Sequence, residues 1–151
     1  MNILAPREIP ATFTPRTLAR FIATLIREDE RWLNQESWTG TAFLHVPAEH
    51  IRVRLTRNEW STSSTACIGG WAAILTLPND AIILSGADRI RMPDGTLTSV
   101  LDHAQHALDL TYSRACWLFN WARTEAQVLA ALDAIAETGT FEIPSLLEPS
   151  W

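Results

Sequence analysis

Residues 63–73, with the sequence Ser-Ser-Thr-Ala-Cys-Ile-Gly-Gly-Trp-Ala-Ala, constrain the fold of this chain more than any other segment. Serine and threonine ahead of a helix accept hydrogen bonds from its unpaired N–H groups, so they predict a helix over residues 65–76. Adjacent glycines inside a helix cost about 1 kcal/mol each relative to alanine. Gly69 and Gly70 therefore indicate that another part of the molecule approaches the backbone closely. This is either the tightest packing point of the core or a cysteine site around Cys67.

Apolar spacing predicts further helices. Apolar residues recur every three or four positions after Thr14 and Pro15, a cap and a first-turn proline, which predicts a helix over residues 15–35. Later helices are expected over residues 99–110, 111–120 and 124–139, opened by the capping residues Ser99, Thr111 and Thr124. Gly139 is expected to end the last of them, because glycine readily adopts the left-handed conformation that follows a helix.

Alternation of apolar and polar residues predicts strands. Residues 50–56 alternate strictly, which is typical of a half-buried strand. Residues 43–46 are its expected partner, with a turn at residues 47–49. The turn signal at residues 93–95, Pro-Asp-Gly, predicts a hairpin over residues 88–98.

Together these patterns predict an α+β fold, a mainly helical single domain over residues 1–151 with a small antiparallel β-sheet from residues 42–56 and 81–98. Residues 1–13 are expected to form an extended leader and residues 140–151 an extended tail. No apolar run approaches the ~20 residues of a membrane span. The first residues also lack the apolar core of a signal peptide, so a cytoplasmic location with reduced thiols is expected.

Four arginines would share one face if both alternating segments were strands of one sheet: Arg52, Arg54, Arg89 and Arg91. Guanidinium groups bind phosphate and carboxylate through paired hydrogen bonds, so this face is a candidate anion-binding site. The simpler interpretation, which we favour, is a solvated face paired with neighbouring acids. The formal net charge of −5 disfavours nucleic acid as the partner, because nucleic-acid binding depends on neutralising phosphates.

Cys67 is the candidate for cysteine chemistry. A thiol near the start of a helix can have a lowered pKa, which would suit a cysteine-dependent hydrolase or transferase. The interpretation that we favour is structural: a small buried thiol beside Gly69, Gly70 and Trp71.

No metal or cofactor site is predicted. His103 and His106 lie one helical turn apart with Cys116 ten residues further on, but no C-x-x-C or H-E-x-x-H pattern accompanies them. A glycine-rich phosphate loop, a catalytic triad and a shared carboxylate pair are also missing from the sequence. We therefore expect no cofactor and no catalytic residue, and a non-enzymatic role is favoured.

Trp117 and Trp121 are the candidate partner-binding residues. They are one helical turn apart, whereas Ala115, Leu118 and Ala122 fall on another face. If that second face packs in the core, the two tryptophans are at least partly exposed. Exposed tryptophan is typical of protein–protein contacts because it offers a large area at low entropy cost. The alternative is that both rings simply cover the core.

Short motifs follow one another along residues 30–135: Asn34-Gln35 after Trp32, residues 65–72, Pro93-Asp94-Gly95, and Leu108-Asp109-Leu110-Thr111 followed by Leu118-Phe119. This set resembles a group of small uncharacterised proteins of actinobacteria and their phages that share a cysteine-x-alanine-glycine-tryptophan helix motif. The chain departs from the group's pattern at three positions: Leu33, Gly69 and Asp109. The resemblance implies a cytosolic, partly phage-borne, mainly helical protein, and it carries over no catalytic residue.

The expected function is therefore that of a small non-enzymatic cytosolic protein, phage-encoded by the resemblance, that binds a host or viral protein. One alternative is binding of nucleic acid or an anionic ligand through the arginine face. A second alternative is a cysteine-dependent hydrolase or transferase that uses Cys67.

Overall fold

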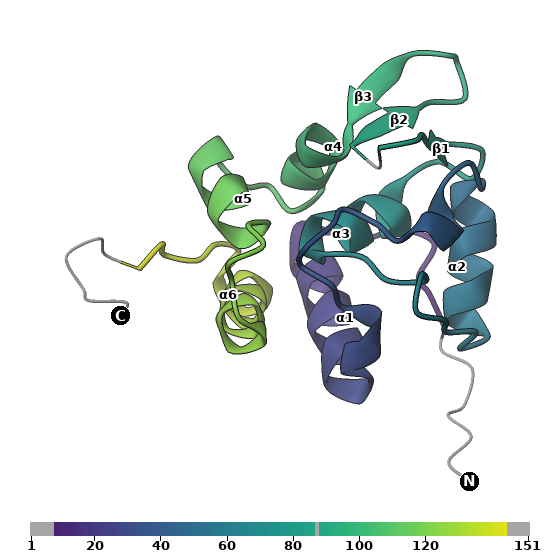
Figure 1. The fold of residues 1–151 in the computed structure, drawn as a ribbon. Coiled ribbons are helices and arrows are strands. Elements are labelled where there is room, and N and C mark those ends of the chain that lie inside the picture. The colour runs from purple at the N-terminus through teal and green to yellow at the C-terminus, as the bar shows by residue number, and fades with distance from the viewer. Residues whose placement is uncertain (1–7, 87, 145–151) are drawn as a thin grey trace, which may run out of the picture.

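Helix α3 (Ile68–Thr76) is the central element of the fold. The computed structural model describes residues 8–86 and 88–144, and within them α3 contacts α1, α2, α4 and α5 (Figure 1). Residues 68–75 are all buried. A helix that is apolar on every side has no face to turn to solvent, which explains why the segment with the glycine pair lies among other helices.

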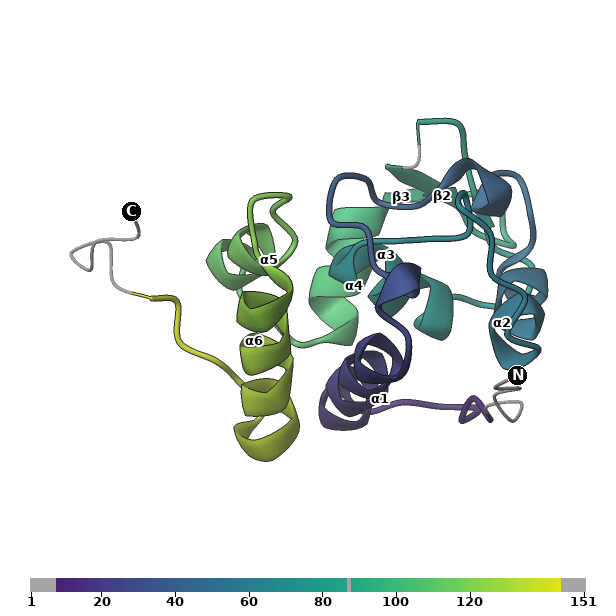
Figure 2. The same cartoon turned by 60° about the horizontal axis from the view of Figure 1, so that its bottom comes forward.

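Helices α1 (Pro15–Glu28) and α6 (Glu125–Thr138) pack against each other (Figure 2). Thr14 caps α1 as predicted, but the helix ends at Glu28 rather than at residue 35. Asp29 is extended and its carboxylate accepts the N–H of Arg31, which begins a short 3₁₀ turn, Glu30–Trp32. Short polar side chains that bond the nearby backbone in this way compete with helix, and here the turn directs Trp32 into the core.

The predicted starts of the three later helices are confirmed. The side chains of Ser99, Thr111 and Thr124 each accept a hydrogen bond from the backbone N–H three residues further on. Helices α4 (Val100–Ala107) and α5 (Tyr112–Leu118) are shorter than expected. Gly139 ends α6 in the left-handed conformation, with φ of 89°.

The predicted hairpin is also confirmed. Strands β1 (Ile82–Ile83), β2 (Arg89–Arg91) and β3 (Leu97–Ser99) form an antiparallel sheet in the order β1-β2-β3. Ile90 of β2 is buried, and the arginines on either side of it are exposed. The fold is therefore α+β and mainly helical, as expected.

The predicted strand over residues 50–56 is wrong, because this segment is helix α2 (Ala48–Thr56). Its buried residues are Ala48, Ile51 and Leu55, whose spacing is helical. Val53, which the strand would have buried, is 39% exposed. The expected partner strand is also wrong: a 3₁₀ turn, Thr41–Phe43, comes first, and residues 44 and 47 make only isolated bridges to β1.

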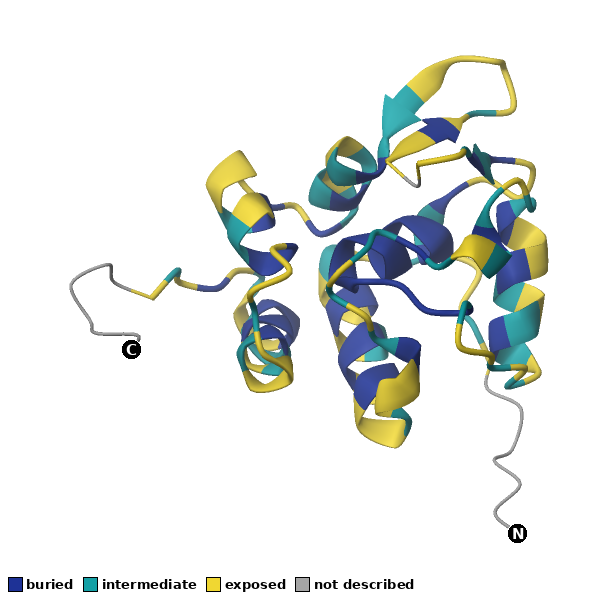
Figure 3. Ribbon diagram, viewed as in Figure 1, coloured by how far each residue is buried: buried dark blue, intermediate teal, exposed yellow. Residues whose placement is uncertain are grey.

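The buried residues form one core that surrounds α3 (Figure 3). Helices α5 and α6 lie on one side of the molecule and α2 on the opposite side (Figures 1 and 2). The described parts of the expected leader and tail, residues 8–13 and 140–144, contain no helix or strand, and the remaining leader and tail residues lie outside the described residues. No helix among the described residues has the length and apolar character needed to cross a lipid bilayer.

Candidate functional site

The start of α3 is a closed site built around Cys67. Cys67 is the N-cap residue, and its sulfur accepts a hydrogen bond from the N–H of Gly70 at 3.4 Å. The side chain of Gln35 caps the same turn, since its Oε1 accepts the N–H of Ile68 at 2.9 Å. Cys67 is only 2% exposed, and burial raises the pKa of its thiol to about 11. Nucleophilic cysteines have lowered pKa values, so this environment does not activate the thiol.

Gly69 and Gly70 lie against Trp38. A β-carbon at Gly70 would overlap the carbonyl oxygen of Trp38, and one at Gly69 would lie 2.5 Å from an atom of the Trp38 ring. The Trp38 ring in turn packs edge-on against Phe119, with ring centroids 5.9 Å apart. The glycine pair therefore makes room for the 34–40 loop, which is the close approach that the sequence indicated.

Trp71 anchors the same end of α3 in the core. Its indole Nε1 donates a hydrogen bond to the carbonyl oxygen of Trp32 at 2.7 Å. Its ring packs edge-on against Trp32 and Phe43, at centroid distances of 5.8 and 5.6 Å. These contacts occupy the indole completely, so Trp71 has a packing role.

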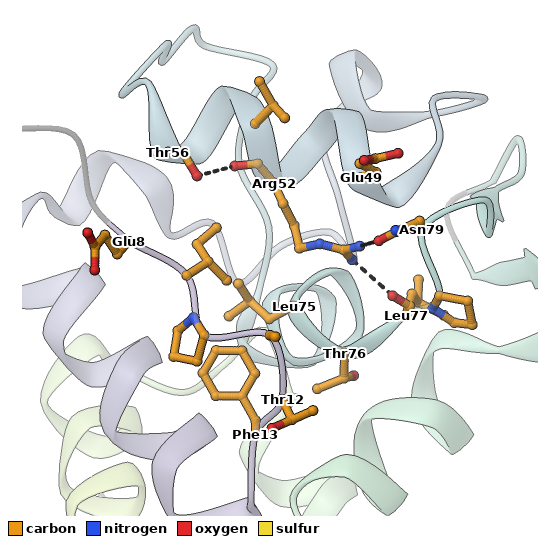
Figure 4. Close-up of a pocket in the computed structure, with 15 residues that line it drawn as sticks. Glu8, Thr12, Phe13, Glu49, Arg52, Thr56, Leu75, Thr76, Leu77 and Asn79 are labelled. Carbon is orange, nitrogen blue, oxygen red and sulfur yellow. Dashed lines mark hydrogen bonds between the residues drawn. The ribbon is translucent and has the colours of Figure 1, made fainter.

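The opposite end of α3 opens onto a cavity of about 1300 Å³ (Figure 4). Residues 8–13 form one wall, one face of α2 forms a second, and residues 75–79 form the third. The apolar side chains around it are Ile9, Phe13, Val53, Leu75 and Leu77. Glu8, Glu49 and Arg52 are its charged residues.

Arg52 holds the end of α3 rather than presenting its charge to the cavity. Its Nη1 donates to the carbonyl oxygens of Ile74 and Leu77, each at 2.9 Å. Its Nη2 donates to Oδ1 of Asn79. Burial lowers the pKa of the guanidinium, while the nearby carboxylate of Glu49 acts against this. The hydroxyl groups of Thr56 and Thr76, which also line the cavity, are hydrogen-bonded within the protein as well.

The predicted arginine face does not form. Arg52 and Arg54 are on helix α2, and Arg54 donates to the carbonyl oxygen of Ala42 at 3.2 Å. Only Arg89 and Arg91 lie on a strand, with both side chains exposed on β2. The correction follows from the wrong strand prediction, because the shared face required both segments to belong to one sheet.

Trp117 and Trp121 lie in different environments. Trp117 is half-buried, with its ring 5.5 Å from that of Phe141 and the guanidinium of Arg123 lying 4.4 Å from its centroid. Trp121 lies beyond the end of α5, in a turn, and is 71% exposed. The helical spacing that would have paired them therefore does not apply. Trp121 is the most exposed large apolar side chain among the described residues, ahead of Tyr112 at 64% and Leu97 at 55%.

The turn that carries Trp121 is held firmly. Oδ1 of Asn120 accepts the N–H of Ala122 at 2.8 Å, and the carbonyl oxygen of Asn120 accepts the N–H of Arg123 at 3.1 Å. The Nε2 of Gln35 donates to the carbonyl oxygens of Leu118 and Asn120, at 3.1 and 3.3 Å. This loop contact was not visible in the sequence.

Three acidic residues belong to the segments that lie next to the same turn. Glu125 begins α6 four residues after Trp121, and its carboxyl group is in hydrogen-bond contact with that of Glu30. Partial burial raises the pKa of Glu125, and the negative charge of Glu30 raises it further. Glu36 follows Gln35 and is exposed. We call Trp121, Glu30, Glu36 and Glu125 the acidic–aromatic surface.

The histidines and Cys116 do not converge on a metal site. Nε2 of His103 lies 2.9 Å from the hydroxyl of Thr76, and burial lowers the pKa of this imidazole. Cys116 is exposed on α5. Within the residues that the structure describes, no group of three or more histidine, cysteine or acidic side chains is arranged to hold a metal ion.

Nε2 of His45 lies 2.7 Å from the hydroxyl of Ser85, a pair that the sequence did not indicate. His45 has a left-handed backbone with φ of 59°, which is uncommon for a residue other than glycine. Both side chains are exposed, so the pair lacks the shielding from water that an active site provides.

Comparisons with known proteins add no family to this picture. No protein-family model, curated protein or solved structure matches the chain. Function is therefore inferred from the closed start of α3, the cavity and the acidic–aromatic surface.

Proposed function

We propose that this protein acts by binding another protein, a host or viral protein if the chain is phage-encoded, and that it does so without catalysis. The observation that carries the proposal is Trp121, a large aromatic side chain that is 71% exposed on a turn fixed by hydrogen bonds. Tryptophan is enriched among the residues that contribute most to protein–protein binding. A rigid turn also loses little conformational freedom when a partner binds.

The alternatives receive less support from the side chains. A cysteine-dependent enzyme needs an accessible thiol with a lowered pKa, whereas Cys67 is buried with a pKa of about 11. Binding of a polyanion needs clustered cations. Arg52 and Arg54 are instead bonded to backbone carbonyl groups, away from Arg89 and Arg91 on β2.

The test is affinity capture with three matched baits: the parent protein, Trp121→Ala and Leu97→Ala. Leu97 is an exposed apolar residue on β3 that belongs neither to the cavity nor to the acidic–aromatic surface, and it serves as the control. We expect a protein that the parent and the Leu97 variant both retain and that the Trp121 variant loses. If every retained protein binds the Trp121 variant equally well, the proposal is wrong.

A further inference from the structure

We infer that the partner bound at the acidic–aromatic surface presents a basic segment, with an arginine or lysine placed on the indole of Trp121 and further positive charge for the acidic residues nearby. The inference rests on the proposed function and adds the chemistry of the partner. The face of a tryptophan ring attracts a cation more strongly than any other aromatic side chain does. Trp121 is the most exposed aromatic side chain among the described residues.

The surface carries negative charge that no ion pair among the described residues neutralises. The ion pairs formed among the described residues leave Glu30, Glu36 and Glu125 unpaired. Two of these carboxyl groups, those of Glu30 and Glu125, are in contact and repel each other when both are ionised. A cation between them would remove that repulsion, so the surface is complementary to positive charge.

The nearest arginines are engaged elsewhere. Arg31 makes a bidentate pair with Asp29, at 2.9 and 2.7 Å, and lies over the ring of Trp60. Arg123 lies over Trp117 and donates to its carbonyl oxygen at 3.0 Å. These two cations hold their own aromatic and acidic partners, and neither lies over Trp121. The same arginine-on-tryptophan contact, which occurs twice among the described residues, is the contact that we assign to the partner.

The test uses a blocked octapeptide of alternating arginine and serine as the probe. The control peptide carries citrulline, which has the shape of arginine without its charge. Binding is followed by the indole N–H resonance of Trp121 in protein labelled with ¹⁵N-tryptophan, assigned with Trp121→Phe. We expect the arginine peptide to shift this resonance, and its affinity to fall at least fivefold between 20 and 200 mM salt. Equal binding of the citrulline peptide would overturn the inference.

Two variants sharpen the result. The double change Glu30→Gln and Glu125→Gln should weaken binding of the arginine peptide at least fivefold, because it removes the charge and keeps the shape. Glu137→Gln, at the other end of α6, is the control and should leave binding unchanged. If both variants bind as the parent does, the carboxylates do not select the partner.

The two proposals fail separately. A protein captured through Trp121 whose retention is unaffected by salt and by the Gln variants would leave the proposed function standing and refute the basic partner. Absence of any Trp121-dependent capture would refute the proposed function, whatever the peptide does.

Discussion

The start of α3 and the turn that carries Trp121 use tryptophan for opposite purposes. At the start of α3, Trp38 lies on two glycines, and no space remains for a single methyl group. Beyond α5, the chain turns at Asn120 and leaves Trp121 in solvent. Gln35 joins the two regions, because its oxygen caps α3 and its nitrogen holds the turn. A tryptophan is therefore packed where a neighbouring backbone leaves room for its ring, as the glycines do for Trp38, and exposed where the chain turns away from the core, as at Trp121.

The largest effect is expected from Gly70→Ala in the closed region. Its added methyl group would overlap a backbone carbonyl oxygen, which cannot rotate away, so we expect a loss of at least about 3 kcal/mol in the free energy of unfolding. Gly69→Ala is the matched control, because its methyl group meets a tryptophan ring that can shift, and it should cost less. Denaturant unfolding measures both. If both variants are more stable than the parent, the glycines are not packing positions.

Gln35→Ala tests the connection between the two regions. Its side chain makes three hydrogen bonds, to Ile68 N–H and to the carbonyl oxygens of Leu118 and Asn120. Their loss should cost about 2–3 kcal/mol, since a net hydrogen bond contributes roughly 1 kcal/mol and the caps of α3 and the turn are left unpaired. Gln127→Ala, which removes one capping hydrogen bond at the start of α6, provides the comparison. Equal costs for the two variants would show that the three contacts of Gln35 do not act together.

Cys67 and Cys116 allow the buried and the exposed environment to be compared in one reactivity experiment. A thiol with a pKa of about 11 is almost wholly protonated at neutral pH, so iodoacetamide should label exposed Cys116 rapidly and Cys67 only after unfolding. Rapid labelling of Cys67 in the native protein would instead support the hypothesis of a cysteine-dependent hydrolase or transferase.

The same pKa predicts a pH dependence of stability. The pKa of the Cys67 thiol is raised from 9.0 to about 11 in the folded protein. Its contribution to the free energy of unfolding is therefore fully present below pH 9 and is lost as the pH rises through 11, because the thiol of the unfolded chain releases its proton at the lower pH. The parent should lose roughly 2 kcal/mol over this range relative to Cys67→Ala, which lacks the thiol. If the difference in the free energy of unfolding between the parent and Cys67→Ala stays constant from pH 8 to 11, the thiol is not buried as described.

Local signals in the sequence predicted much of the fold, and long-range contacts account for what was missed. The caps at Ser99, Thr111 and Thr124 depend on residues three positions away, and all three were correct. The α2 segment was assigned to a strand because Ile51 and Leu55 fit both alternation and helical spacing.

The candidate site was less accessible to sequence analysis. Trp121 was identified, but its pairing with Trp117 depended on a helix that ends at Leu118. The contact of Glu30 with Glu125 joins residues far apart in the chain, as does the contact of Gln35 with Asn120. Such pairs arise from the packing of α1 against α6 and of the 34–40 loop against the end of α5, which periodicity does not encode.

The smallest effect is expected from Trp121→Ala. The indole is 71% exposed and makes no ring contact within the described residues, so its removal leaves no cavity. Changes at exposed positions away from caps and ion pairs usually alter stability by less than about 0.5 kcal/mol. The free energy of unfolding of Trp121→Ala should therefore match that of the parent, while Trp71→Ala in the core should lose about 3–5 kcal/mol. A loss above about 1 kcal/mol at Trp121 would mean that the ring stabilises the fold, and its exposure could then no longer be interpreted as a surface kept for a partner.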